Sequence, residues 1–95
     1  MTHNENLLVC LLEECGETGQ RASKALRFGI NEIQKGQPLT NAERIVYEFN
    51  DIMAVMEIMR DAGLISKIID RDAIELKKKK LLEGIIYSIK EGCIV

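Results

Sequence analysis

The chain has 95 residues, which is enough for one domain with a modest core. Its 13 basic and 15 acidic residues give a net charge of −2, and this balance excludes a general electrostatic attraction to nucleic acid or to an anionic membrane surface. No apolar run approaches the roughly 20 residues of a membrane span, and the first residues do not resemble a secretion signal. We therefore expect a cytoplasmic protein that binds neither nucleic acid nor membrane.

Hydrophobic residues make up 46% of the chain but aromatic residues only 4%, so packing must depend on aliphatic side chains and methionine. The three cysteines, Cys10, Cys15 and Cys93, form no Cys-x-x-Cys pair and have no nearby histidine that would complete a zinc site. We expect all three to be reduced. The only histidine, His3, lies close to the N-terminus and is a weak candidate for any chemistry.

Helical spacing of apolar residues from Asn6 to about Phe28 predicts a first long helix, and Gly29 is a plausible end for it. Gly16 and Gly19 lie inside this segment and lower its helix propensity by roughly 1 kcal/mol each relative to alanine. Our interpretation is that they allow another backbone to pack closely beside the neighbouring acidic residues.

A connection is predicted from Ile30 to Leu39, with a short helical turn over residues 31–35. Thr40 and Glu43 then match a capping box, in which each side chain accepts a hydrogen bond from the backbone N–H of the other residue. A second helix should begin here and run to Ala62, before Gly63. Asp70 is a candidate cap for a third helix that extends toward Lys90.

No strand-like alternation or internal repeat competes with these helices, so the sequence predicts an all-α fold in a single domain over residues 1–95. Three main helices of this length make a helical bundle whose four-helix-type core is incomplete. We expect a short helix or oligomerisation to complete it, with a homodimer or a homotetramer as the assembly.

Acidic residues recur at helical spacing in two places. Glu14 and Glu17 share one helix face, with Glu13 beside them, and Glu48 and Asp51 share a face of the second helix. If the two helices bring these side chains together, the carboxylates repel one another strongly unless cations lie among them. The alternative is that they point into water, where Arg21 can pair with Glu17 and Arg44 with Glu48.

The two acidic segments, Glu13-Glu14-Cys15-Gly16-Glu17 and Glu48-Phe49-Asn50-Asp51, resemble the Glu-Glu-x-x-Glu and Glu-x-x-Asp motifs of MazG-like nucleotide pyrophosphohydrolases in the all-α NTP pyrophosphatase superfamily. The segment from Gln20 to Gly29 is also similar to small single-domain MazG-like proteins of phages and bacteria. The resemblance covers roughly residues 7–64. The gap between the motifs is long for the family, and Asn50 stands where a small residue is common.

The resemblance implies a magnesium-dependent enzyme, with manganese as a substitute, that cleaves a nucleoside triphosphate between the α and β phosphates. It implies Glu14, Glu17, Glu48 and Asp51 as the metal ligands. Carboxylates suit magnesium, which prefers oxygen ligands, and the absence of helical histidines argues against a di-iron site. The candidates for the remaining roles are Glu13 and Glu14 in catalysis and Lys24, Arg27, Lys77 and Lys80 in substrate binding.

Two other functions remain open. The chain could be a noncatalytic nucleotide-binding or protein-interaction module that retains the helical scaffold, which its methionine-rich second helix favours. It could also be a structural helical protein whose acidic residues only keep its surface soluble.

Overall fold

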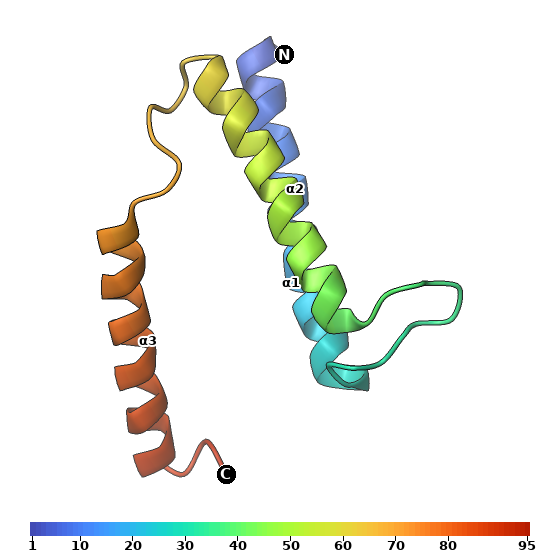
Figure 1. Ribbon diagram of the computed structural model, residues 1–95, viewed down its shortest axis with the longest axis vertical. Coiled ribbons are helices and arrows are strands. Elements are labelled where there is room, and N and C mark those ends of the chain that lie inside the picture. The colour runs from blue at the N-terminus through green and yellow to red at the C-terminus, as the bar shows by residue number, and fades with distance from the viewer.

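The structure of the protein is a computed structural model that describes all residues from 1 to 95. It contains three helices, α1 (His3–Phe28), α2 (Asn41–Asp61) and α3 (Arg71–Lys90), and no strand (Figure 1). The predicted all-α class with three main helices is confirmed. None of the helices combines the length and the apolar character needed to cross a membrane.

Side-chain caps fix where the helices begin. The Thr40 hydroxyl accepts a hydrogen bond from the Glu43 backbone N–H at 3.1 Å, and the Glu43 carboxylate accepts one from the Thr40 N–H at 3.1 Å, as the capping box predicted. Thr2 and Glu5 form a second capping box, which starts α1 three residues earlier than the apolar pattern suggested. Asp70 caps α3 by accepting from the Ala73 N–H at 3.1 Å.

The connection between α1 and α2 is extended, so the helical turn expected over residues 31–35 was wrong. Ile33 and Thr40 form an isolated antiparallel bridge instead. Gly36, at φ 83°, makes the reversal between them in a conformation that residues with a side chain rarely adopt. The connection thus has the form of a small hairpin, and it returns the chain to start α2 beside the end of α1.

Asn41, the first residue of α2, holds the two ends of this connection together. Its side chain is fully buried and donates from Nδ2 to the Gly29 carbonyl oxygen at 2.8 Å and to Glu32 Oε1 at 3.1 Å. Its backbone N–H donates to the Glu32 carbonyl at 3.0 Å. Because these bonds tie the end of α1 to the start of α2, they help to set the register of the two helices.

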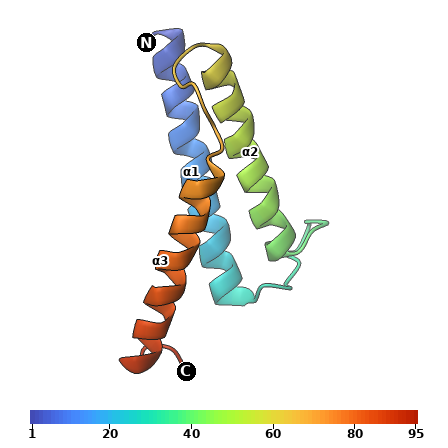
Figure 2. The ribbon, with the colours of Figure 1, turned by 60° about the vertical axis from the view of Figure 1, so that its left-hand side comes forward.

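The helices α1 and α2 pack against each other along their length in antiparallel directions, whereas α3 packs on neither of them (Figures 1 and 2). The turn after α2 is well defined, since Gly63 adopts φ 79° and the Leu64 N–H donates to the Met59 carbonyl at 2.9 Å. The chain then leads away, and α3 lies apart from the α1–α2 hairpin (Figure 1). The packed unit of a single chain is therefore the α1–α2 hairpin.

The core of this hairpin is small, because Leu7 and Met59 are its only buried hydrophobic residues. The expected role of Gly16 and Gly19 was wrong for the single chain. A Cβ atom placed on either glycine would meet no other atom within 4 Å, so no backbone of this chain packs closely there.

Candidate metal site

The contact face of α1 is set by a seven-residue repeat. Leu7, Glu14 and Arg21 are two helical turns apart from one another, so they lie on the same face of the helix. Leu7 and Arg21 are buried and Glu14 is half-buried, which shows that this face is turned toward α2. The acidic residue thus lies in the middle of the contact face and not on the solvent side.

Helix α2 mirrors this arrangement in the opposite direction. Asn41 is buried at its start, Glu48 is half-buried two turns later, and Met59 is buried near its end. Since the helices are antiparallel, the half-buried glutamates Glu14 and Glu48 come together at the centre of the hairpin. The centre of the contact is therefore polar, with apolar packing toward one end.

Four carboxylates meet at this centre. One oxygen from each of Glu14, Glu17, Glu48 and Asp51 lies within 4.8 Å of the oxygens of the other three. Glu17 and Asp51 are exposed, so the cluster is open to solvent on one side. We call these four residues the carboxylate cluster. They are the residues at the spacing that the sequence had singled out, and the two pairs come from different helices.

The electrostatic environment opposes ionisation of the two inner carboxyls. Partial burial raises the pKa of Glu14 above its usual value of 4.5, and the charges of Glu17, Asp51 and Glu48 raise it further. The pKa of Glu48 is raised by burial first and then by the charges of Glu17 and Asp51. The folded chain therefore favours positive charge at this point, either as protons or as a metal ion.

Arg21 supplies part of that positive charge. It is only 8% exposed, and its guanidinium lowers the pKa of Glu48, which partly offsets the effect of the neighbouring acids. It forms no ion pair with Glu17, and its Nη1 atom is buried without a hydrogen-bond partner. The surface pairing of Arg21 with Glu17 considered from the sequence is thus not formed, and burial of the arginine was not predicted.

The second pairing considered from the sequence is also absent, because Arg44 Nη1 donates to Gln34 Oε1 at 3.0 Å and not to Glu48. One guanidinium beside four carboxylates leaves a clear excess of negative charge when all four are ionised. Neutralisation of the acids by arginines on their own helices therefore does not account for the cluster.

The donor set of the cluster suits magnesium. All four donors are carboxylate oxygens, and Oε2 of Glu14 and Oε2 of Glu48 are both buried without any hydrogen-bond partner. Oxygens that share one octahedral Mg²⁺ at 2.0–2.1 Å lie about 3 to 4 Å from one another. The limit of 4.8 Å is slightly wider, so small side-chain rotations would bring the oxygens to bonding distance.

The other predicted residues on α1 lie outside the cluster. Glu13 is exposed, and it is a neighbour of the cluster only in the sequence, where it precedes Glu14. Lys24 is half-buried and lies ten residues beyond Glu14, which is about 15 Å along the helix. The Arg27 guanidinium lies 4.7 Å from the centre of the Phe28 ring, where the cation contacts the aromatic face.

The predicted substrate residues on α3 are not brought to the cluster by the single chain. Lys77 lines a cavity of about 430 Å³ between α2 and the beginning of α3, and no residue of the carboxylate cluster lines it. Lys80 is exposed on the same helix. Contact between either lysine and a phosphate group at the cluster would need a different position of α3 or an α3 from another chain.

Comparisons of the chain with protein-family models, with curated proteins and with solved structures found no match. The resemblance to MazG-like enzymes therefore rests on the motif residues themselves.

Proposed function

We propose that the protein is a magnesium-dependent nucleoside triphosphate pyrophosphohydrolase that releases a nucleoside monophosphate and pyrophosphate. Its role would be to remove unwanted nucleotides or to adjust a nucleotide pool. The observation that supports this proposal is the carboxylate cluster: four acidic side chains from two helices converge, and two of them hold buried oxygens without partners. Both acidic motifs of the family resemblance meet in this cluster.

Each carboxylate has a distinct part in the proposal. Glu14 and Glu48 are half-buried in the helix contact and would hold the inner side of the metal, whereas exposed Glu17 and Asp51 would leave its outer side open to phosphate. Bound magnesium would supply positive charge for the phosphate oxygens and lower the pKa of a coordinated water. The reaction then consists of attack by a water oxygen on the α-phosphorus and departure of pyrophosphate. Exposed Glu13 is the candidate to accept the proton of that water.

The direct test is pyrophosphate release from a panel of ribo- and deoxyribonucleoside triphosphates with magnesium or manganese. Glu17→Ala and Asp51→Ala should each abolish turnover, because each removes one exposed carboxylate without disturbing the buried face. Glu57→Ala, an exposed acid elsewhere on α2, is the matched control and should retain activity. Full activity in both cluster variants would refute the proposal.

Isothermal titration with nucleotide, with and without magnesium, separates this function from the main alternative. Tight binding without any product in the panel would assign a noncatalytic nucleotide-binding module instead. The absence of any magnesium effect on binding, turnover or stability would leave the acidic residues with a solubilising role only.

A further inference from the structure

Arg21 is the only charged residue that is buried in this chain. Its guanidinium has five N–H donors, yet it forms no hydrogen bond or ion pair, and Nη1 is enclosed without any partner. Removal of a cation from water is costly unless opposite charge compensates it. The charge of Arg21 must therefore be balanced by groups that it does not touch directly.

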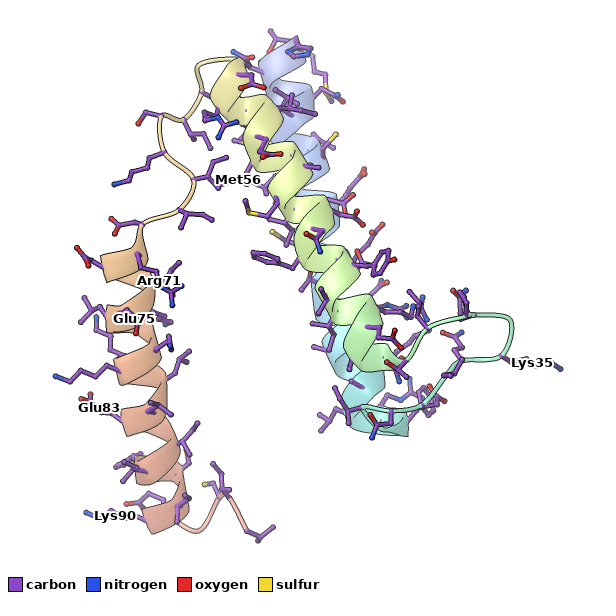
Figure 3. All side chains as sticks on the ribbon, viewed as in Figure 1. Lys35, Met56, Arg71, Glu75, Glu83 and Lys90 are labelled. Atoms are coloured by element: carbon purple, nitrogen blue, oxygen red, sulfur yellow. The ribbon has the colours of Figure 1, made fainter.

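The other four arginines differ from Arg21 in both respects. They are exposed or half-buried, and each contacts a partner: Phe28 for Arg27, Gln34 for Arg44, Asp61 for Arg60 and Glu75 for Arg71. Arg71 and Glu75 lie together on α3, away from the α1–α2 hairpin (Figure 3). Arg21 is thus the one arginine of the chain that is both enclosed in the helix contact and without a partner.

The register of the hairpin directs Arg21 toward the carboxylate cluster. Arg21 lies seven residues after Glu14 on α1, which is about 10.5 Å along the helix. Asn41 lies the same distance before Glu48 on antiparallel α2, so Arg21 and Asn41 face each other at one end of the cluster. Side chains on a helix lean toward its N-terminus, and Arg21 and Glu48 therefore lean toward each other. The lowering of the Glu48 pKa by the charge of Arg21 agrees with this arrangement.

The balance of charge at the cluster indicates a single metal ion. The four carboxylates carry four negative charges when ionised, and Arg21 offsets one of them. One divalent ion then leaves one negative charge, whereas a second would make the site positive. Two-metal sites place their ions about 3.5–4 Å apart, where the ions repel each other and depend on the charge of the surrounding carboxylates. Without the arginine, two divalent ions would balance the four carboxylates.

We propose that Arg21 takes the place of a second cation and limits the carboxylate cluster to one divalent ion per chain. The guanidinium lies on the contact face between the helices, so it leaves the exposed side of the cluster, at Glu17 and Asp51, open for that ion and its waters. A second ion needed to neutralise a triphosphate would arrive with the nucleotide. This inference rests on the metal site of the proposed function but not on its reaction.

The test is a count of bound Mn²⁺ without nucleotide, obtained from the electron paramagnetic resonance signal of the free ion during a titration. The wild type should bind one ion per chain. Arg21→Met keeps the length of the side chain but removes its charge, so it should bind two ions. The first of them should bind about five- to tenfold more tightly than in the wild type, because repulsion by a nearby positive charge is lost. Two ions in the wild type, or a single ion in Arg21→Met, would overturn the proposal.

Two further variants show whether the charge at this position is responsible. Arg21→Lys retains the charge and should bind one ion, and two ions in this variant would overturn the proposal. Arg60→Met is the matched control, because it removes an exposed arginine of α2 outside the cluster and should bind one ion. If circular dichroism shows that Arg21→Met is unfolded, Arg21→Gln replaces it.

The spectrum of the bound ions shows where the second ion lies. Two manganese ions about 3.5–4 Å apart couple their electron spins, whereas an ion at a distant surface acid does not couple to the first. Arg21→Met should show this coupling and the wild type should not. A second ion without coupling in Arg21→Met would overturn the proposal.

The ion count and the pyrophosphate assay let the two proposals fail separately. One ion in the wild type and two in Arg21→Met, without any pyrophosphate release by the wild type, would support the role of Arg21 and reject the reaction. Two ions in the wild type with full turnover would do the reverse. No bound ion in either protein would reject the metal site and both proposals with it.

Discussion

Replacement of Glu48 by glutamine should stabilise the metal-free protein, and most of that advantage should be lost with magnesium. The change keeps the shape of the side chain but removes one charge from the carboxylate cluster. It also removes a proposed metal ligand whose Oε2 is buried without a partner. Without metal, Glu48→Gln should therefore unfold at a higher temperature than the wild type. With magnesium, this difference in stability should shrink by about 1 kcal/mol.

The sizes of both effects follow from the geometry. Two unit charges 4.8 Å apart interact by about 1 kcal/mol in a water-like dielectric, which is the appropriate value here because Glu17 and Asp51 are exposed. Loss of the Glu48 charge should thus stabilise the metal-free protein by about 1–2 kcal/mol. Magnesium at ten times its dissociation constant adds about 1.4 kcal/mol to the wild type, or roughly 6–11 °C in Tm. A tenfold loss of affinity in the variant reduces that gain to about 0.4 kcal/mol.

The assay is thermal unfolding followed by circular dichroism, in EDTA and over a magnesium titration, with protein concentration held constant. Glu57→Gln is the matched control, because it makes the same chemical change at an exposed site on the same helix outside the cluster. It should behave as the wild type in both conditions. If Glu48→Gln is less stable than the wild type in EDTA and gains the full magnesium shift, the carboxylates neither repel one another nor bind the metal together.

Three further perturbations test other parts of the structure. In EDTA, the free energy of unfolding should fall as the pH rises from 4.5 through the raised pKa values of Glu14 and Glu48, because in that window the folded chain binds more protons than the unfolded chain. Thermal melts with magnesium should show a smaller fall. Asn41→Ala should cost about 2–3 kcal/mol in urea unfolding, since it removes two side-chain hydrogen bonds from a fully buried site, and a loss below 0.5 kcal/mol would show that the site relaxes. Thr40→Ala should cost about 1 kcal/mol through loss of the helix cap, whereas Thr40→Gly should cost only a few tenths, and equal losses would contradict a capping role.

Much of the secondary structure was predictable because its causes are local. The capping boxes and the Asp70 cap act over three residues, and helical spacing alone puts Glu14 with Glu17 and Glu48 with Asp51. The capping box at Thr2 was missed because the apolar pattern begins only after it. The connection was predicted as partly helical because no residue pattern there signals an isolated bridge between Ile33 and Thr40.

The sequence by itself determined the helices, their caps and which side chains share a face, because these depend on hydrogen bonds and spacing within a few residues. Only the tertiary structure decided that the Glu14 face meets the Glu48 face, that Arg21 is buried beside them, and that α3 remains apart. The two faces meet because of the register of α1 against α2. Asn41 helps to fix this register through its hydrogen bonds to Gly29 and Glu32. Contacts between residues distant in the chain depend on the packing of whole helices, which no local spacing specifies.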